Sequence, residues 1–457
     1  MTSTCFDYAR AHENQFLEEL KAFLQIPSVS TQAEHRPDMI RAAVWMRDQL
    51  LAIGFPRAEV MPTRGHPIIY AEWLAAGPEK PTVLIYGHYD VQPPEPFELW
   101  HTPPFEPTVI GDNLFARGAS DDKGQLFVHV KALEAFQQTA GAPPVNIKIL
   151  IEGEEEIGSP SLDPFIREHQ DLLRADVALI SDSHILGKDL PTIVYALRGM
   201  AYVEVEVTGP ASDLHSGIYG GAVHNPINAL CAMIAKLQDE DGRILIPGFY
   251  DKVRDLEPEE RAELAKIPFD REVWLAEAGV IREWGEPGYT IIERTMARPT
   301  LDVNGIWGGY TQPGAKTVLP SKAFAKISMR LVPDQEPEEI SRLIAEYFRA
   351  LAPATVTVEV RDLHGGEGAM VRRDSPEMAA AFRAYKAAFG REPILVREGG
   401  SIPVVATFQK VLGIDTILMG FGLPDDNLHA PNEKLAVSNF HRGVQTSLHF
   451  LTNLAEL

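Results

Sequence analysis

The sequence predicts an α/β fold in which a small α+β domain is inserted into a larger α/β domain. The larger domain is indicated by short apolar runs that are typical of buried strands in a central, mostly parallel sheet. Three of these runs lie in the first half of the chain, at 82–86, 145–151 and 177–180. The inserted domain is indicated by strictly alternating runs at 201–209 and 322–332, a pattern typical of a sheet with one wet face. The change of pattern near Arg198 predicts a domain boundary.

Helices alternate with the strands of the predicted larger domain. Two amphipathic segments, 13–24 and 39–53, predict helices ahead of the first strand, and the second ends at Gly54. A third helix at 124–138 lies between the first two strands, which is the order of an α/β domain. The α/β pattern occurs again near the end of the chain, where we expect a helix at 375–389 and strands at 393–397 and 415–422.

The inserted domain has the order strand, helix, strand, strand, helix, strand. This is the split βαβ order of a ferredoxin-like α+β domain. Its expected elements are 201–209, 225–237, 297–304, 322–332, 337–351 and 354–363. The Glu-rich stretch 238–296 indicates an insertion that is partly helical. We therefore expect the α/β domain to comprise 1–198 and 369–457, and the inserted domain to comprise 199–368.

Charge and cysteine content limit the classes of partner and compartment. The 457 residues include 42 Lys and Arg against 64 Asp and Glu, a net charge of −22, which argues against nucleic acid and anionic membranes as partners. Cys5 and Cys231 form no CxxC pattern, so neither a disulfide framework nor a thiolate metal site is expected. The sequence shows neither a signal peptide nor an apolar run of the ~18 residues that a membrane helix needs. These features predict a cytoplasmic protein.

Ionisable side chains follow the predicted strands of the larger domain. His88 and Asp90 come two residues apart, directly after 82–86. The other strand ends are followed by EGEEE, SDS and a loop that contains His429, and SDD precedes the helix at 124–138. These stretches supply Glu152, Glu154, Glu155, Glu156, Asp182, Asp121 and Asp122. Because the carboxyl ends of the strands form the ligand crevice of an open α/β sheet, we expect these groups to converge.

So many carboxylates need positive charge between them. Two like charges about 4 Å apart repel by ~4 kcal/mol even at an effective dielectric constant of about 20, so divalent metal ions are the usual solution. Two imidazoles with carboxylates and no thiolate suit Zn²⁺, with Mn²⁺ or Co²⁺ as alternatives, and one aspartate can bridge two metals. Taken singly, each motif also has a structural explanation: a polar strand end, a solvated acidic loop, a helix N-cap or a surface histidine.

Several short motifs occur together in one order. They are GHYDVQP, RGASDDKG, EGEEEIGS, ISDS, DLHSGIYGG, EGGSIP and HAPNEK. In order and spacing the sequence resembles the di-zinc metallopeptidases of the aminoacylase, glutamate carboxypeptidase and dipeptidase family, over nearly the whole chain. Within that family it is most similar to the cytosolic non-specific dipeptidases and carnosine dipeptidases. The resemblance implies an α/β catalytic domain and an inserted lid and dimerisation domain.

The resemblance also implies a metal centre with two Zn²⁺ ions per subunit. The ligands would be His88 and Asp182 for one metal, Glu156 and His429 for the other, and Asp121 as the bridge. Asp182 stands where several branches of the family have glutamate and the dipeptidase branch has aspartate. A cis peptide bond is implied between Asp121 and Asp122.

Three further residues receive catalytic roles from the resemblance. Glu155 would be the general base that takes a proton from the attacking water and returns it to the leaving amine. Asp90 would hold the other ring nitrogen of His88. His215 of the inserted domain would stabilise the oxyanion in the active site of the neighbouring subunit, which implies an obligate homodimer. The simpler alternatives are a solvated glutamate, a strand-end cap and a loop histidine that caps a Gly-rich turn.

Substrate recognition is expected to come from the inserted domain and one nearby loop. Arg330 would bind a free carboxylate of the substrate, because its planar guanidinium suits that group. Ser401 and Thr317 match positions that assist, and Gly400 would let the backbone approach the substrate closely. Asn225 either lines the site or caps the helix that follows it. Closure of the lid would complete the site.

The sequence thus predicts an enzyme that hydrolyses dipeptides with a free C-terminal carboxylate. An N-acyl amino acid amidohydrolase, such as a deacetylase or desuccinylase, is the alternative, and a carbamoyl amidohydrolase is a more distant one. Asp182 and the insertion at 238–296 favour the dipeptidase. A metal-binding or partner-binding protein without catalysis is disfavoured, because every matched position carries a competent residue.

Overall fold

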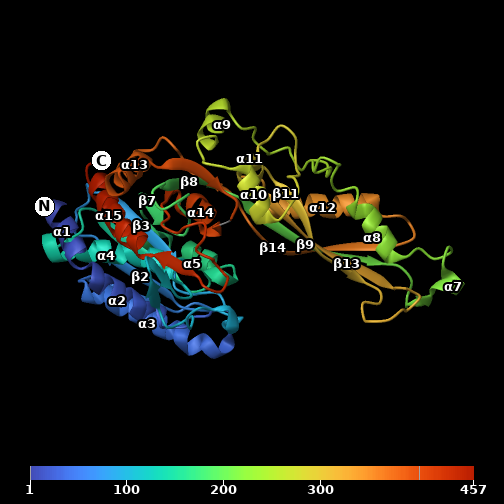
Figure 1. Ribbon diagram of the computed structural model, residues 1–457, viewed down its shortest axis with the longest axis horizontal. Helices are drawn as coiled ribbons and strands as arrows, with labels where there is room; N and C mark the ends of the chain where they lie inside the picture. Colours follow the sequence, from blue (N-terminus) through green and yellow to red (C-terminus); the bar gives the residue numbers. More distant parts are fainter. Residues whose placement is uncertain (1, 401) are drawn as a thin grey trace. The chain divides into compact units, whose positions relative to one another are not determined.

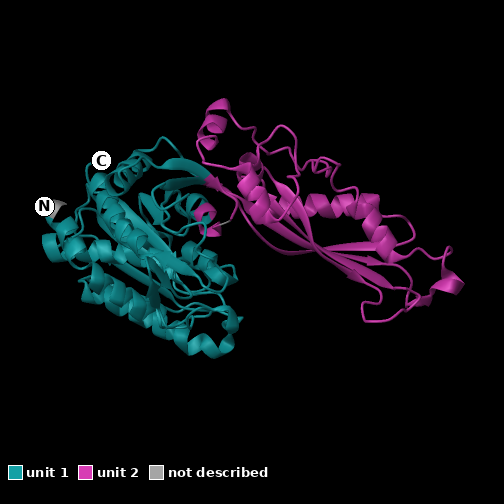
Figure 2. Ribbon diagram, in the orientation of Figure 1, with its two compact units in different colours: residues 1–195, 371–396, 407–457 teal, residues 196–370, 397–406 magenta. Residues whose placement is uncertain are grey.

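The chain folds into two compact units (Figures 1 and 2). The structure, a computed structural model, describes residues 2–400 and 402–457. Unit 1 contains the residues up to Tyr195 together with 371–396 and 407–457, and unit 2 contains 196–370 and 397–406. Within unit 2, an ion pair between Arg397 and Glu260 holds the segment 397–406. The chain therefore returns to unit 2 inside the stretch that we expected to lie wholly in the α/β domain.

The larger sheet contains the parallel strands that the apolar runs predict. Its strands are β1 (Arg57–Met61), β2 (Ile68–Trp73), β3 (Thr82–His88), β6 (Asn146–Glu152), β7 (Val177–Ile180), β8 (Thr192–Leu197), β15 (Ala369–Met370), β16 (Ile394–Glu398) and β17 (Asp415–Leu418). Among the described residues the order is β1-β2-β6-β3-β7-β17-β8-β15, with β16 beside β8. The central strands β6, β3, β7 and β17 run parallel, and antiparallel pairs flank them. The expected α/β class is confirmed.

The carboxyl ends of the central strands lie at one edge of this sheet. His88, the last residue of β3, is in register with Glu152, the last residue of β6. Tyr86 of β3 pairs with Ile180, the last residue of β7. The acidic loops after β6 and β7 therefore begin beside His88, and this register is what positions the candidate site.

Helices cover the larger sheet (Figure 1). They are α1 (Thr2–Ala11), α2 (Glu13–Leu24), α3 (Arg36–Ala52), α4 (Lys123–Ala140), α5 (Leu162–Glu168), α6 (Gln170–Leu173), α13 (Pro376–Phe389) and α15 (Val437–Leu454). The helices expected at 13–24, 39–53, 124–138 and 375–389 are confirmed as α2, α3, α4 and α13. α4 is buried from Lys123 to Phe136, with α1, α2 and α15 packed against it. α15 lies outside the helices expected from the sequence.

A small sheet in unit 1 joins two of the sequence motifs. Its strands are β4 (Thr108–Ile110), β5 (Asn113–Phe115) and β18 (Lys434–Ala436), in the order β18-β5-β4. Lys434, at the end of the HAPNEK motif, pairs with Phe115, which shortly precedes the RGASDD loop. This pairing brings the loops of Asp121 and His429 together, although they are far apart in the sequence.

Unit 2 contains the expected ferredoxin-like domain. Its main elements are β9 (Gly199–Thr208), α8 (Pro226–Ile234), β11 (Thr300–Gly308), β13 (Lys322–Leu331), α12 (Pro337–Leu351) and β14 (Thr357–Gly366). The sheet order is β11-β13-β9-β14, and every pair is antiparallel. Alternate residues of β9 and β13 are buried in a core shared with α8 and α12, which includes Val205, Ile327 and Phe348. The sequence pattern alternates because one face of this sheet is covered by α8 and α12.

The remaining elements of unit 2 are short. They are β10 (Leu214–His215), α7 (Ser216–Tyr219), α9 (Pro258–Leu264), α10 (Arg271–Ala278), α11 (Ile291–Ala297) and β12 (Val318–Leu319), while α14 (Pro403–Thr407) ends at the unit boundary. α9, α10 and most of α11 lie in the stretch 238–296, which is therefore partly helical as expected. In the part of the chain that the structure describes, no helix combines the length and the apolar character that crossing a membrane requires.

Candidate metal centre

Loops of unit 1 bring together all five residues expected to bind metal. One group consists of His88, Asp121 and Asp182, and a second consists of Asp121, Glu156 and His429. In each group the potential ligand atoms all lie within 4.8 Å of one another. Asp121 belongs to both groups, which is the position of a bridging ligand.

Asp121 lies between the two histidines. Its Oδ1 is 3.1 Å from Nε2 of His88, and its Oδ2 is 2.9 Å from Nε2 of His429. One carboxylate thus offers one oxygen to each side of the centre. The peptide bond between Asp121 and Asp122 is cis, as the resemblance implies.

Asp90 connects His88 to the acidic loop. Nδ1 of His88 lies 3.3 Å from Oδ1 of Asp90 and 3.1 Å from the Asp90 carbonyl oxygen. The carboxylate of this fully buried aspartate also accepts hydrogen bonds from the backbone N–H groups of Glu155 and Glu156, at 3.2 and 3.1 Å. Asp90 therefore orients the imidazole and anchors the start of the turn that carries both glutamates.

Glu156 has one carboxylate oxygen engaged and one without a partner. Its Oε2 accepts a hydrogen bond of 2.8 Å from Nε2 of Gln92 and lies 3.3 Å from Nε2 of His429. Its Oε1 is buried and makes no hydrogen bond with any described residue. A buried carboxylate oxygen without a donor is costly, and a cation satisfies it. Gln92 was not among the expected site residues, although it lies in the motif GHYDVQP.

Several side chains of the centre have shifted pKa values, and carboxylates outnumber imidazoles there. Burial would raise the pKa of Asp121, but hydrogen bonds from His429 and His88 outweigh burial and lower that pKa below its usual value. Hydrogen bonds to Asp121 and Glu156 raise the pKa of His429 to about 10. Burial raises the pKa of Glu155 well above its usual value, and nearby carboxylates add to the shift. The centre therefore attracts positive charge.

The residues present fit divalent metal ions. Two imidazoles and three carboxylates form a donor set that suits Zn²⁺, Mn²⁺ or Co²⁺. A cation in each ligand group would satisfy the unpartnered oxygen of Glu156 and would contact one oxygen of the Asp121 carboxylate. Divalent metal binding, which the sequence predicts, is therefore consistent with the geometry.

Glu433 holds the loop that carries Asp121. Its buried carboxylate accepts hydrogen bonds from the backbone N–H groups of Gly118, Ser120 and Asp121, at 2.9, 3.0 and 3.1 Å. Arg117 balances the charge through a hydrogen bond of 2.7 Å. Sequence reasoning missed this residue, although it lies in the HAPNEK motif, because no local signal links it to a loop from the first third of the chain.

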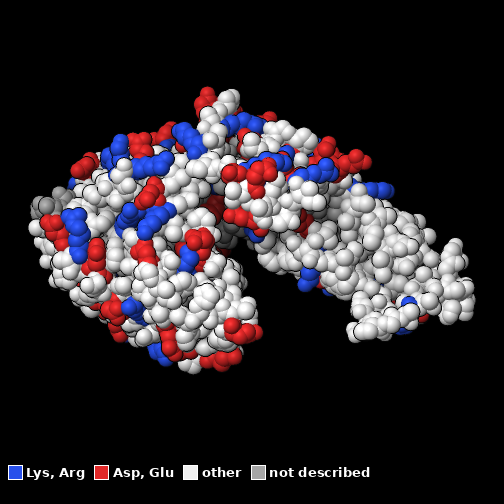
Figure 3. Space-filling view, viewed as in Figure 1, with Lys and Arg blue, Asp and Glu red and all other residues white. Residues whose placement is uncertain are grey.

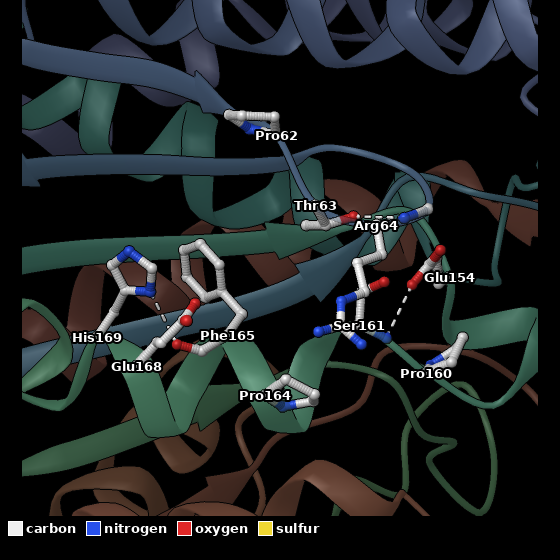
Figure 4. A pocket seen from close by; sticks show the side chains of 11 residues that line it. Pro62, Thr63, Arg64, Glu154, Pro160, Ser161, Pro164, Phe165, Glu168 and His169 are labelled. Carbon is white, nitrogen blue, oxygen red and sulfur yellow. Dashed lines mark hydrogen bonds between the residues drawn. The ribbon is translucent and has the colours of Figure 1, made fainter.

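Two glutamates of the EGEEE stretch serve the fold. Glu152 is buried and accepts a hydrogen bond of 2.5 Å from the hydroxyl of Tyr86. Glu154 accepts hydrogen bonds from the N–H groups of His66 and Ser161, at 2.9 and 3.0 Å. It lines a cavity of about 590 Å³ together with the α5 side chains seen in Figure 4. Of this stretch, Glu156 belongs to a candidate ligand group, and Glu155 directly precedes it in the chain.

In unit 2, a short antiparallel pairing brings His215 beside Thr317. His215 pairs with Val318, and the N–H of Ser216 donates to the carbonyl of Thr317 at 3.1 Å. Nδ1 of His215 accepts a hydrogen bond of 3.0 Å from the N–H of Gly217 and so caps α7. A neutral imidazole whose Nδ1 is an acceptor carries its proton on Nε2, so this nitrogen is a hydrogen-bond donor.

Arg330 and Asn225 also lie in unit 2. Arg330 is near the end of β13, in register with Met200 and Thr300. Oδ1 of Asn225 accepts a hydrogen bond of 2.9 Å from the N–H of Ile227, so the alternative of a helix cap is confirmed for this residue.

The EGGSIP loop contains two glycines in different surroundings. A Cβ on Gly399 would lie 2.8 Å from a guanidinium nitrogen of Arg198 and 3.0 Å from the carbonyl oxygen of Thr295. The nearest atom to a Cβ on Gly400 would be 3.9 Å away, and Gly400 is exposed. Packing therefore requires glycine at 399, whereas Gly400 leaves its backbone open to a ligand. Ser401 lies outside the described residues.

The fold and the metal-ligand groups together define a class of protein. An α/β unit with paired histidine and carboxylate groups at its strand ends, and an inserted ferredoxin-like unit, is the arrangement that the resemblance implies. The sequence matches peptidase family M20/M25/M40 over residues 84–453. The chain belongs to this family of metallopeptidases.

Relatives align with nearly the whole chain. The Cys-Gly metallodipeptidase dug1 of Schizosaccharomyces pombe is 35% identical over 462 residues, which cover 97% of this chain and 96% of that protein. The human Beta-Ala-His dipeptidase is 32% identical and covers 99% of this chain, with 92% of its own length aligned. The crystal structure of an M20 family metallo-carboxypeptidase from Sulfolobus solfataricus superposes with a TM-score of 0.86 at 33% identity, covering 97% of this chain and 99% of that chain.

Proposed function

We propose that this protein hydrolyses the peptide bond of dipeptides with a free C-terminal carboxylate, in a metal-dependent reaction. The observation that carries the proposal is the position of Asp121, whose two carboxylate oxygens face His88 and His429. The alignment over nearly the full length with proteins named as dipeptidases supports a dipeptide as the substrate.

Two divalent cations are part of this proposal. We assign them as Zn²⁺, with Mn²⁺ or Co²⁺ as alternatives, because the donor set has imidazoles and carboxylates without thiolate. His88, Asp182 and Asp121 would hold one cation, and Glu156, His429 and Asp121 the other. Bound cations would lower the pKa of the attacking water toward ~7 and polarise the amide carbonyl.

Glu155 is the general base in this mechanism. It takes a proton from the attacking water and transfers it to the leaving amine nitrogen. Its position next to Glu156 and the hydrogen bond from its N–H to Asp90 support this role. Asp90 acts on the reaction by holding the His88 ring and this turn in place.

Unit 2 supplies the groups that bind the substrate in this proposal. The Nε2–H group of His215 suits the oxyanion that develops on the amide carbonyl oxygen. Arg330 suits the C-terminal carboxylate, which it can bind through two parallel hydrogen bonds. The assisting residues are Thr317, Gly400, Ser401 and Asn225, the last through the helix that it caps.

We also propose a homodimer through unit 2, in which His215 acts in the active site of the partner subunit. The part of unit 2 that carries α7 and α8 displays few charged atoms (Figure 3), although the chain has a net charge of −22. Cys231 and Ala232 of α8 are exposed, and Ile218 of α7 is 72% exposed. An uncharged surface with exposed apolar side chains suits contact with a second copy.

A cytoplasmic location is the last part of the proposal. Cys5 and Cys231 are both free cysteines. Free thiols fit a reducing compartment, in which disulfides are rare.

A substrate panel tests the proposed function. Amine release is measured with added Zn²⁺ or Mn²⁺ on plain dipeptides, β-alanyl dipeptides, and N-acetyl and N-succinyl amino acids. We expect hydrolysis of the unblocked dipeptides. Hydrolysis of only the N-acylated compounds would instead assign the protein as an amidohydrolase, and inactivity toward the whole panel would contradict both assignments.

A further inference from the structure

Unit 2 contains a cavity of about 400 Å³ beside Arg330. It lies wholly within this unit, between the last part of the insertion, the start of β11 and the start of β9. The charged residues that line it are Arg198, Arg294, Arg298, Arg330, Glu286 and Asp302. We call this cavity the arginine pocket.

Positive charge exceeds negative charge in the arginine pocket. Four arginines line it against two carboxylates, a surplus of two positive charges in a chain whose net charge is −22. Glu286 is engaged by Arg298, which donates to both of its carboxylate oxygens, at 2.7 and 2.9 Å. Arg243, which does not line the pocket, donates to the same carboxylate at 3.2 Å. The charge of Glu286 therefore does not neutralise the other three arginines of the pocket.

Arg198 is held close to Arg330. Among the described residues its guanidinium donates only to neutral groups, the carbonyl oxygens of Gly399 and Arg298, at 3.2 and 3.4 Å. Burial lowers the pKa of Arg198 to about 10, the positive charge of Arg330 adds to this shift, and the negative charge of Asp302 opposes it in part. Two guanidinium groups that repel each other in a partly buried wall favour an anion beside them.

Arg294 faces the same pocket from α11. Its Nε donates to the carbonyl oxygen of Glu286 at 2.9 Å, which orients the guanidinium. This contact is with a neutral carbonyl, and the carboxylate of Glu283, which does not line the pocket, interacts with Arg294 through charge. The pocket thus presents arginines from three separate segments of unit 2: the start of β9, α11 and β13.

We propose that the arginine pocket accepts the side-chain carboxylate of a C-terminal aspartate or glutamate in the substrate. The proposal rests on the proposed function, in which Arg330 binds the C-terminal α-carboxylate. The side chain of the terminal residue and its α-carboxylate share one Cα, so a pocket beside Arg330 is placed to receive that side chain. Acidic dipeptides would then be the preferred substrate class.

The test compares dipeptides that end in aspartate or glutamate with dipeptides that end in the neutral isosteres asparagine and glutamine. The ratio kcat/KM is measured on the metal-loaded protein for Ala-Ala, Ala-Asn, Ala-Asp, Ala-Gln and Ala-Glu. We expect each acid to exceed its amide by about tenfold, because a charge-assisted hydrogen bond to a guanidinium is stronger than one to a neutral amide. Arg294→Gln should bring the acid-to-amide ratio toward one, and Arg294→Lys should retain more of it.

Arg282→Gln is the matched control, since Arg282 is an exposed arginine of the same insertion that does not line the pocket. This variant should keep the wild-type ratio. Ratios near one in the wild type, or a ratio that Arg294→Gln leaves unchanged, would overturn the pocket assignment while the dipeptidase function stands. Failure to hydrolyse any of the five peptides would overturn the proposed function and this assignment with it.

Discussion

At the scale of single residues, neighbouring glutamates in one loop differ in what they contact. Glu152 and Glu154 accept hydrogen bonds from protein groups, so their carboxyl oxygens are engaged within the fold. Glu156 keeps one buried oxygen without a donor. Glu155 lies beside it, with its N–H bonded to Asp90. These contacts separate a structural glutamate from a candidate ligand or base, which composition cannot do.

The proposed roles of Glu155 and Glu156 predict different effects on activity and metal content when each residue is replaced by glutamine. Glu155→Gln should lower kcat about 10²-fold to 10⁴-fold, because the amide has nearly the same shape but cannot accept the proton of the attacking water. The metal content of the purified protein should be unchanged. Both quantities are measured on one preparation, by dipeptide hydrolysis and by elemental analysis.

Glu156→Gln is the matched comparison, since it removes a negative charge from an expected ligand. We expect it to lower metal content together with activity. Wild-type activity in Glu155→Gln would remove that residue from its role as base, whatever the result for Glu156.

At the scale of elements, α4 links the loop of Asp121 to the segment that carries Asp182. It begins just after the Asp121 loop and is buried over most of its length. In its middle, the ring of His129 lies 2.7 Å from the hydroxyl of Ser181, which precedes Asp182, and 3.0 Å from the hydroxyl of Ser447 in α15. Burial lowers the pKa of His129 to about 3. The imidazole is therefore neutral in the folded protein at ordinary pH.

This buried histidine predicts a pH dependence of stability. Below an unfolded-state pKa of ~6.5 the unfolded chain binds a proton that the folded protein does not bind until pH falls to about 3, so stability is present above pH ~6.5 and falls below it. The loss should approach ~1.4 kcal/mol per pH unit. The free energy of unfolding is measured by urea titration between about pH 7 and 5, for the wild type and His129→Gln.

The difference between the two curves isolates His129, because the other titrating groups are common to both proteins. We expect the glutamine variant to be less stable near neutral pH and to show the flatter dependence. Parallel curves over this range would show that His129 is not held neutral by burial.

At the scale of the whole molecule, the two units contain different parts of the proposed machinery. Unit 1 contains the metal-ligand groups and Glu155, and unit 2 contains His215 and Arg330. If His215 serves the partner subunit, activity is a property of the dimer, and each site needs residues from two chains.

Mixing two inactive variants tests this arrangement. Glu155→Gln and His215→Ala are each expected to have little activity. In an equal mixture that exchanges subunits, about half of the dimers are mixed, and each mixed dimer contains one complete site, so activity should recover to about a quarter of the wild-type value. The mixture is assayed with an unblocked dipeptide after the subunits have been allowed to exchange.

The control is Glu155→Gln mixed with Glu156→Gln, because both changes lie in the same unit 1 and no mixed dimer contains a complete site. This mixture should remain inactive. Size measurement by light scattering establishes that each variant is dimeric. If subunits exchange in the mixture of Glu155→Gln and His215→Ala but activity does not recover, His215 does not act in the partner's site.

Much of this architecture follows from local sequence patterns. The runs at 82–86 and 177–180 appear as β3 and β7, because continuous short apolar segments suit parallel strands that are covered on both faces. The alternation at 322–332 appears as β13, with one face on a helix-covered core. The resemblance in the motifs was enough to indicate the family and the expected ligands, since the motifs occur together in one order and spacing along the chain.

Other features depend on contacts between segments that are distant in the sequence. Glu433 reaches the Asp121 loop because β18 pairs with β5, and Gln92 reaches Glu156 because two strand-end loops meet. The arginine pocket likewise arises where the insertion meets the starts of β9 and β11. The sequence by itself determined the elements, the family and the chemistry available at the strand ends, because hydrophobic periodicity and short motifs are local. Only the tertiary structure decided which polar groups are partnered and which remain for a ligand, because hydrogen bonding and burial depend on every segment that packs around a residue.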